Sequence, residues 1–242
     1  MGRSRIFMDL KRFFSDCVDW DKRTAVLRDG EFYHAVKVTR HKVGYKLVIC
    51  NGDDFDYNCE VTEITKDALY ARIESRTENK TELKNPVVLY VGVNKDIDTV
   101  VQKAVEMGVR KIVPFTSAHS NVDKINIDRL NKIVVESSKQ CGRNRLAEIR
   151  PLVTYKEALF VAKDTNIFFY YEYERNNKTC DVSIDDRETS VFIGSEGGFS
   201  SDEVAYAKEA GAKLLTLGDR ILRVSTAVVS ALTLVIERRG EI

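Results

Sequence analysis

The sequence predicts a small all-β domain followed by an α/β domain with a mainly parallel sheet. In the first 75 or so residues, short runs of alternating apolar and polar residues are separated by turn signals. From about Asn85 onward, continuous apolar runs alternate with segments whose apolar residues recur at helical spacing. The polar segment 76–86 between these parts ends in a proline, as inter-domain linkers often do. We therefore expect domains at residues 1–75 and 76–242.

Four alternating runs in the first domain predict strands. They lie at residues 35–39, 45–50, 57–64 and 68–74. Asn51 and Gly52 separate the second run from the third, and an Asn-Gly pair between alternating runs predicts a hairpin. Short strands joined by tight turns close into a small barrel or sandwich.

The second domain begins with an apolar run at 87–93, which is typical of a parallel strand covered on both faces. A helix is expected after Asp96, because apolar residues then recur at helical spacing until Gly108. The next strand is expected at 111–115, and the next helix runs toward Cys141. Later strands are expected at residues 167–171, 190–193 and 213–217. Strand and helix thus alternate, which favours a parallel sheet.

The last helix is expected from Ser225 onward, where nearly every position to Ile236 is apolar. A helix that is apolar all round is normally buried. We expect this one to lie in the core or against another subunit.

The composition points away from membrane spans, metal sites and a strongly basic surface. Hydrophobic residues make up 43% of the chain and charged residues 31%, which suits a core with a solvated surface. No apolar run reaches the roughly 18 residues that a membrane span needs. The net charge of +1 gives no overall nucleic-acid signal. The five cysteines lack C-x-x-C spacing and the three histidines are scattered, so we expect reduced thiols in a cytoplasmic protein and no metal.

A glycine-rich segment comes after the strand expected at 190–193. Gly194 to Phe199 contains three glycines, and Ser200 with Glu203 then forms a capping-box pattern that predicts a helix start. Turns between a strand and a helix are where α/β proteins usually hold ligands. Taken alone, the segment is equally consistent with a tight turn that binds nothing.

Five blocks of the sequence resemble the SPOUT superfamily of methyltransferases, and in particular the bacterial enzymes that methylate ring nitrogen 3 of a uracil in 16S ribosomal RNA. The blocks lie at residues 101–109, 139–151, 193–200, 217–223 and in the terminal helix. The first domain resembles that family's PUA-like RNA-binding domain. The resemblance implies a C-terminal trefoil knot, an α/β knot, in the second domain.

The resemblance also implies S-adenosylmethionine as cofactor, a homodimer, and 16S rRNA of the small ribosomal subunit as partner, with no membrane or metal. The expected cofactor-binding residues belong to the two glycine-containing loops. They are Ile193, Gly194, Ser195, Glu196, Gly197, Gly198, Leu217, Gly218, Ile221 and Leu222. Glu196 is expected either to accept hydrogen bonds in this loop, to pair with an arginine, or to serve only as a turn residue.

Three arginines are the candidate catalytic residues. Methylation of a uracil nitrogen needs a base, or a cation that stabilises the uracil anion. Arg143, Arg145 and Arg223 are candidates for that cation or for phosphate contacts, because guanidinium gives planar bidentate recognition. No residue is identified as the proton acceptor.

The RNA-binding candidates lie in the first domain. They are Arg3, Arg5, Lys11 and Arg12, which could meet phosphates. Elsewhere, Lys103 and Glu106 lie three residues apart on one helix face, where we expect a simple ion pair.

The chain departs from the family at two places. Ser195 stands where the family usually has proline, and Val224-Ser225-Thr226-Ala227 stands where it usually has T-E-T-A. Ser225 is expected to cap the last helix, but a carboxylate is lost there. Two alternatives therefore stay open: a SPOUT enzyme with another RNA target such as a ribose hydroxyl, and an RNA-binding assembly factor without turnover. A plain nucleotide-binding α/β protein ranks last, because the chain lacks a P-loop and a G-x-G-x-x-G.

Overall fold

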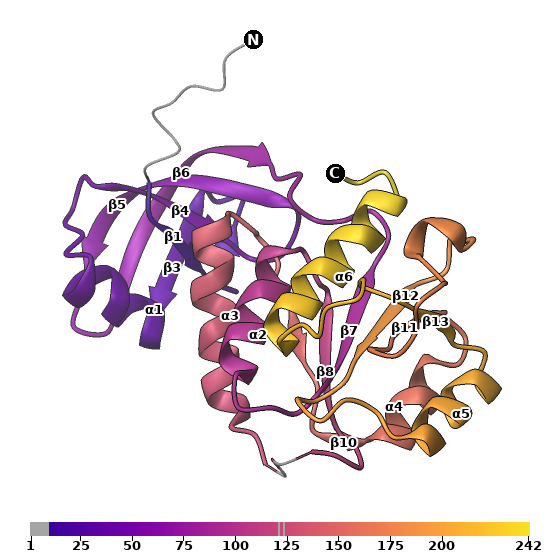
Figure 1. Cartoon of the computed structure of the whole chain (residues 1–242). Helices are drawn as coiled ribbons and strands as arrows, with labels where there is room; N and C mark the ends of the chain where they lie inside the picture. The colour runs from indigo at the N-terminus through magenta and orange to yellow at the C-terminus, as the bar shows by residue number, and fades with distance from the viewer. Residues whose placement is uncertain (1–9, 121, 123) are drawn as a thin grey trace. The chain divides into compact units, whose positions relative to one another are not determined.

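The computed structural model describes residues 10–120, 122 and 124–242 (Figure 1). The chain divides into two compact units. One runs to Glu82 and also includes Ser138–Leu146, and the other comprises Leu83–Ser137 and Ala147–Ile242. The domain assignment of 1–75 and 76–242 stays a prediction.

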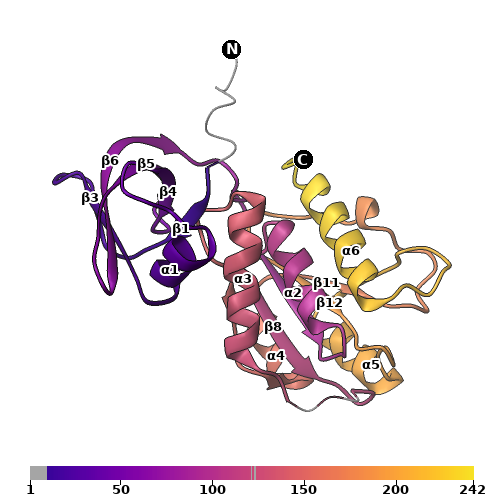
Figure 2. The same ribbon diagram turned by 90° about the vertical axis from the view of Figure 1, so that its left-hand side faces the viewer.

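The first unit is built on a curled, mostly antiparallel sheet (Figure 2). Its strands follow the order β1 (Arg12–Phe14), β4 (Lys46–Cys50), β5 (Phe55–Ile64), β6 (Ala68–Glu78), β3 (Thr24–Arg28) and β2 (Val18–Asp19). Only β1 and β4 pair in parallel among the described strands of this sheet. Phe13, Leu27 and Leu47 are fully buried in the core that the sheet encloses. The β4–β5 hairpin confirms the turn predicted at Asn51 and Gly52.

The strand predicted at 35–39 is wrong, because this segment is helical. It comes after the short helix α1 (Asp29–Tyr33) and forms the π-helical turn η2 (His34–Val38). The Thr39 N–H donates to the His34 carbonyl at 2.9 Å, which closes the wide turn. Ala35 is fully buried in the sheet core, whereas Val38 is 59% exposed. Packing of Ala35 thus outweighs the strand preference of the two valines.

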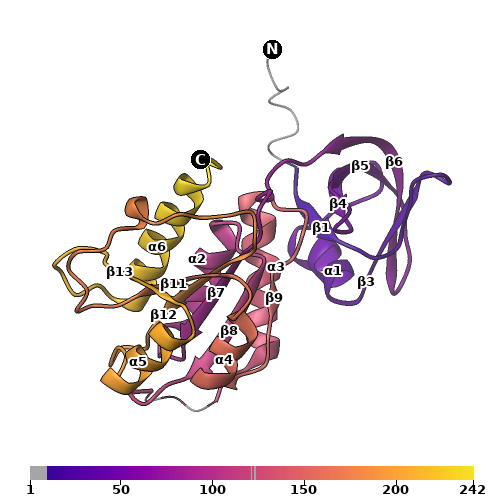
Figure 3. The ribbon, with the colours of Figure 1, turned by 90° about the vertical axis from the view of Figure 1, so that its right-hand side faces the viewer.

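The second unit has a parallel sheet, as the alternation of strands and helices predicted (Figure 3). Its strand order is β10 (Val153–Thr154), β8 (Lys111–Thr116), β7 (Val87–Gly92), β12 (Thr189–Ile193), β11 (Asn166–Tyr170) and β13 (Lys213–Leu215), and β9 (Glu148–Ile149) pairs with β8. Every residue of β7, β11 and β12 is buried, as expected for central strands covered on both faces.

Helices cover both faces of this sheet. They are α2 (Ile97–Glu106), α3 (Ile127–Cys141), α4 (Tyr155–Ala162), α5 (Ser201–Glu209) and α6 (Val224–Arg238), with a short 3₁₀ turn η3 (Thr179–Asp181). Side chains of α4 and α5 share one core cluster with β7, β8, β11 and β12. Helices α2 and α6 pack against each other on the opposite face (Figure 1). Among the described residues, no helix is long and apolar enough to cross a membrane.

Helix α6 is buried along one face, which confirms the expected place of the last helix in the core. Val228, Ala231 and Leu232 are fully buried, whereas Leu234 is 40% exposed. Its apolar residues therefore extend beyond the buried face. The trefoil knot that the resemblance implies stays a prediction.

Candidate functional site

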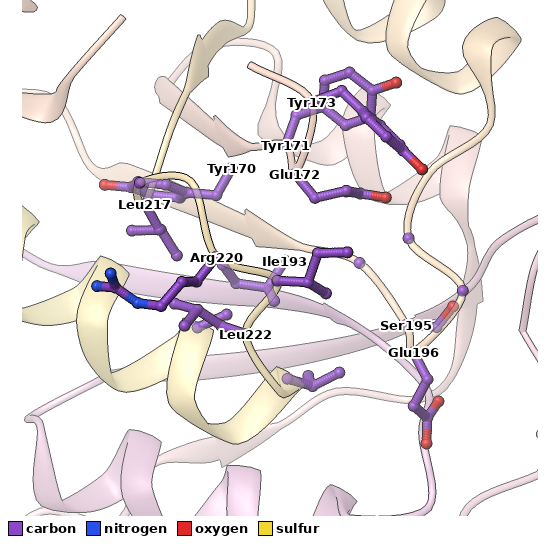
Figure 4. A pocket seen from close by; sticks show the side chains of 17 residues that line it. Tyr170, Tyr171, Glu172, Tyr173, Ile193, Ser195, Glu196, Leu217, Arg220 and Leu222 are labelled. Carbon is purple, nitrogen blue, oxygen red and sulfur yellow. The ribbon is translucent and has the colours of Figure 1, made fainter. Parts of the chain in front are cut away.

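A pocket lies where the central parallel strands of the second unit end (Figure 4). Three segments line it: residues 170–173, which begin at the end of β11, residues 193–198, which begin at the end of β12, and residues from 217 into the first turn of α6. Its volume is about 210 Å³. All ten residues expected to bind the cofactor line this pocket. The structure therefore brings the two glycine-containing loops into one site, in the position where α/β folds usually bind ligands.

The first loop is held against the end of β7 by close backbone contact. A Cβ on Gly92 would lie 2.4 Å from the backbone nitrogen of Ser195, so only glycine fits there without a shift. Gly198 has φ +66°, and its N–H donates to the Ser195 carbonyl at 3.0 Å. The glycines thus give the loop a tight turn whose backbone faces the pocket.

His119 fastens the other side of the same loop. The Ser195 hydroxyl donates to the His119 carbonyl at 3.2 Å, and the His119 Nδ1 lies 3.0 Å from the Gly197 carbonyl oxygen. A Cβ on Gly197 would lie 2.6 Å from the His119 Cβ. Ser195, which stands in place of the family's proline, therefore ties the loop to the segment after β8.

Two carboxylates anchor the loop at its ends. Glu196 accepts a hydrogen bond from the Lys95 N–H at 2.9 Å, and its part in cofactor binding stays a prediction. The capping box predicted at the start of α5 is confirmed, because Ser200 and Glu203 bond each other's backbone N–H groups at 3.2 and 2.9 Å. Glu203 additionally accepts from the Ala118 N–H at 2.8 Å.

The second loop turns at Gly218, which has φ +97° and whose N–H donates to Thr216 Oγ1 at 3.0 Å. Ile221 is 82% exposed at its tip. The expected cap at Ser225 is wrong: α6 begins at Val224 with Arg223 as N-cap residue, and no side chain caps it. Ser225 lies inside the first turn, beyond the position from which a side chain bonds the free N–H groups.

Seven further residues that line the pocket were not among the expected ones. They are Tyr171, Glu172, Tyr173, Tyr170, Arg220, Val224 and Ala227. The first three come directly after β11, which pairs in parallel with β12 so that Tyr170 lies opposite Ile193. Strands that pair in parallel end at the same edge of the sheet, so the segment after β11 meets the glycine loop. The run of aromatic residues ending at Tyr171 was a signal for the strand, but it did not show which strand is its neighbour.

Two candidate catalytic arginines belong to the first unit and pair with carboxylates there. Arg143 is 3% exposed, and its Nε and Nη2 donate to Glu82 at 2.8 and 2.6 Å. Arg145 Nη2 donates to Asp54 at 2.8 Å. Arg223 is exposed at the N-terminus of α6, directly between pocket-lining residues. The catalytic roles of the three stay predictions.

The candidate RNA-binding residues have different surroundings. Arg3 and Arg5 lie outside the described residues, and Lys11 is exposed. Arg12 is half-buried, because its guanidinium donates to Asp56 at 2.5 and 2.8 Å and to Cys50 Sγ at 2.8 Å. Burial alone would lower the pKa of Arg12, but the hydrogen bond and the charge of Asp56 raise it. Arg12 therefore stays charged within a structural ion pair.

Two smaller expectations can be compared with the structure. Lys103 and Glu106 form the predicted ion pair at 2.9 Å. In the part of the chain that the structure describes, no group of His, Cys, Asp and Glu side chains could hold a metal ion.

Known proteins resemble this chain in sequence and in fold. Residues 81–236 match an RNA methyltransferase domain family, and residues 27–74 match the RNA methyltransferase PUA domain. The ribosomal RNA small subunit methyltransferase E of Aquifex aeolicus is 32% identical over 216 residues, which cover 86% of this chain and 92% of that protein. The enzyme of the same name from Mesomycoplasma hyopneumoniae is 33% identical over 171 residues, which cover 67% and 74%.

A solved structure gives the same assignment. The ribosomal RNA small subunit methyltransferase E from Neisseria gonorrhoeae, bound to S-adenosyl methionine, matches with a TM-score of 0.87 at 26% identity. The match covers 94% of this chain and 97% of that one. By sequence and by fold, the chain belongs to the ribosomal RNA small subunit methyltransferase E family.

Proposed function

We propose that the protein uses S-adenosylmethionine to methylate ring nitrogen 3 of a uridine in 16S rRNA of the small ribosomal subunit. The observation that carries the proposal is the pocket in which both glycine-containing loops meet at the ends of parallel strands. The names of the relatives support an rRNA substrate, and the bound ligand of the Neisseria gonorrhoeae structure supports the cofactor.

The residues of the pocket fit this cofactor. Ile193, Leu217 and Leu222 give apolar walls for a flat adenine, as ligand sites commonly do (Figure 4). A Cβ added to Gly218 would meet no atom within 4 Å, so the bare backbone of the second loop faces open space into which a ligand can come close. The loop backbones supply hydrogen-bonding groups for the ribose and the adenine edge.

The chain's own part in the reaction is to hold and orient the reactants. S-adenosylmethionine supplies, when bound, an electrophilic methyl group. The loop clamped by Gly92, Ser195 and His119 holds its shape before binding, so little entropy is lost in aligning that group. The uracil imide must lose its proton, and a nearby cation lowers the energy of the resulting anion.

We propose Arg223 as the cation closest to the chemistry, because its neighbours Leu222 and Val224 line the pocket. Arg145 pairs with Asp54 but is exposed, and we propose that it helps bind phosphates. Arg143 is buried against Glu82, so a phosphate contact there would require this ion pair to open first. We propose that Lys11, and by sequence Arg3 and Arg5, contact RNA phosphates.

We further propose that the protein is a homodimer and acts in the cytoplasm, where bacterial rRNA is made. The partly exposed apolar side of α6, which includes Leu234, supports a subunit contact. Sedimentation equilibrium tests it: a monomer at micromolar concentration would remove the dimer from the proposal.

The activity is tested by incubating the protein with methyl-labelled S-adenosylmethionine and small ribosomal subunits that lack the modification. Nucleoside analysis of the 16S rRNA should show labelled 3-methyluridine. A labelled 2′-O-methylnucleoside would instead support the ribose-methylating alternative.

One observation favours the alternative of an RNA-binding assembly factor without turnover. The first turn of α6 has no acidic residue, whereas the family usually has a glutamate at the position of Ser225. Binding of both the cofactor and the RNA without any labelled product would favour an assembly factor. A Ser225→Glu variant that then gained activity would trace the loss to this position.

A further inference from the structure

Two carboxylates line the pocket, and they differ in their partners. Glu196 accepts the Lys95 N–H at 2.9 Å and anchors the loop. Glu172 is only half-buried, and its carboxylate makes no hydrogen bond or ion pair with any of the residues 10–120, 122 and 124–242. This negative charge in a pocket of mixed polar and apolar lining is thus left without a counter-charge from the described chain.

The position of Glu172 is defined by the glycine loop. Its Oε1 would lie 1.8 Å from a Cβ on Gly198, so the carboxylate rests directly on the backbone of that glycine. Figure 4 shows the Glu172 side chain extending from the end of β11 toward the segment that contains Ser195 and Glu196. The absence of a side chain at Gly198 leaves the room that the carboxylate occupies.

The two nearby arginines, Arg175 and Arg220, do not pair with the Glu172 carboxylate. Arg175, three residues along the chain, donates from Nη1 to the main-chain carbonyl of Glu172 at 2.5 Å and not to its carboxylate. Arg220 is the one cationic side chain among the described residues that line the pocket. In Figure 4 its guanidinium points away from Glu172, toward the opposite side of the site. Among the described residues that line the pocket, no cationic side chain thus faces the Glu172 carboxylate, and a cationic ligand bound there would supply its nearest counter-charge.

We propose that Glu172 recognises a positive charge on the bound cofactor and so makes the pocket prefer a cationic ligand to a neutral one of the same shape. This inference rests on the proposed function, since S-adenosylmethionine carries two positive groups, the sulfonium and the α-ammonium. Opposite charges a few ångströms apart attract more strongly beside a protein wall than in bulk water, and Ile193 and Leu217 form part of that wall here.

Calorimetric titration of the purified full-length protein tests the inference without any turnover. The ligands are S-adenosylmethionine, S-adenosylhomocysteine, which keeps only the ammonium, and 5′-methylthioadenosine, which has neither charge. The variant is Glu172→Gln, which keeps the shape and removes the charge. The matched control is Glu209→Gln, an exposed carboxylate at the end of α5 that does not line the pocket.

Glu172→Gln should weaken S-adenosylmethionine binding about two- to fivefold, the size expected for a half-exposed charge pair, and leave 5′-methylthioadenosine binding unchanged. Glu209→Gln should change neither. S-adenosylhomocysteine shows which positive group Glu172 recognises. If Glu172→Gln binds it as well as the wild type does, the group is the sulfonium. If Glu172→Gln loses as much affinity for it as for S-adenosylmethionine, the group is the ammonium. A Glu172→Asp variant, which keeps the charge but shortens the side chain, should fall between Glu172→Gln and the wild type.

Two results would overturn the inference. Unchanged S-adenosylmethionine binding by Glu172→Gln would show that the charge is not used, and an equal loss for 5′-methylthioadenosine would show an effect of shape. Both leave the proposed function standing. If the wild-type protein bound none of the three ligands, the proposed function itself would fail instead.

Discussion

Gly92 and Ser195 come so close that a Cβ on Gly92 would lie 2.4 Å from the Ser195 backbone nitrogen. Gly92 is the last residue of β7, and Ser195 lies just beyond β12, which pairs with β7 in parallel. The loop that lines the pocket therefore crosses directly over the end of the neighbouring strand. The position of this loop therefore depends on residue 92 being glycine.

We expect Gly92→Ala to displace this loop, because the obstacle is backbone and cannot rotate away. Overpacking of this kind costs about 1–3 kcal/mol of stability. The affinity for S-adenosylmethionine should fall along with the melting temperature. Gly30→Ala is the control, since a Cβ there meets no atom within 4 Å and Gly30 lies in the helix α1. Wild-type affinity in Gly92→Ala would show that the loop position is not needed for binding.

Ser195→Ala should cost about 1 kcal/mol, the usual value of one hydrogen bond, because the bond to the His119 carbonyl is lost. Urea unfolding would measure this loss. Because the contact between His119 and the Gly197 carbonyl remains, the glycine loop should stay partly held in Ser195→Ala. Cofactor affinity should therefore fall less than in Gly92→Ala. If Ser195→Ala were as stable as the wild type, the hydrogen bond from the Ser195 hydroxyl to the His119 carbonyl would contribute nothing to stability.

The sequence was informative where residue type alone decides structure. Gly194, Gly197 and Gly198 marked the loop, and Ser200 with Glu203 marked the start of α5 before any contact was known. Through the family resemblance, both pocket loops were predicted.

The residue types did not predict which distant segments of the chain lie next to each other in the fold. Glu172 reaches the pocket only because β11 lies beside β12, and Arg143 is buried only because residues 138–146 return to the first unit. Local pattern also failed at 35–39, where alternation indicated a strand although one buried alanine fixes a helix.

Arg143→Ala should destabilise the protein by about 3 kcal/mol or more, because it leaves the Glu82 carboxylate without its bidentate partner. A double-mutant cycle with Glu82→Gln, measured by chemical unfolding, would give the coupling energy. If Arg143 also acts in catalysis, kcat at a temperature where both variants are folded should fall more for Arg143→Ala than for Glu82→Gln. Equal effects on kcat would assign Arg143 to structure alone.

Tyr173→Ala should raise the KM for RNA about tenfold, because an exposed aromatic ring at the pocket can stack on an unpaired base, worth roughly 1–3 kcal/mol. Tyr173 is 66% exposed, and its ring lies 5.4 Å from that of Tyr171. Phe160→Ala is a matched control, because Phe160 is 65% exposed on α4 and does not line the pocket. Equal KM changes in both variants would contradict the stacking role.

Stability should fall as the pH rises from about 9 toward 12. Burial raises the pKa of the Cys50 and Cys59 thiols to about 12, whereas an unfolded thiol ionises near 8.5. Between these values the unfolded chain releases protons that the folded chain keeps, so alkaline pH favours unfolding; below about 8.5 the contribution is fully present. Urea unfolding at several alkaline pH values would measure the slope. A Cys59→Val variant should show a shallower slope, and an identical slope would exclude Cys59 as a source.

The path of the chain through the two units limits how the protein can be divided. Because Ser138–Leu146 belongs with the residues up to Glu82, the first unit is discontinuous in sequence. A fragment that ends at Glu82 would lack Arg143, Arg145 and the Gly142 carbonyl that accepts from Asn79. A fragment that starts at Leu83 would carry those nine residues without their partners. Neither unit is therefore a ready-made module for gene fusion or exchange.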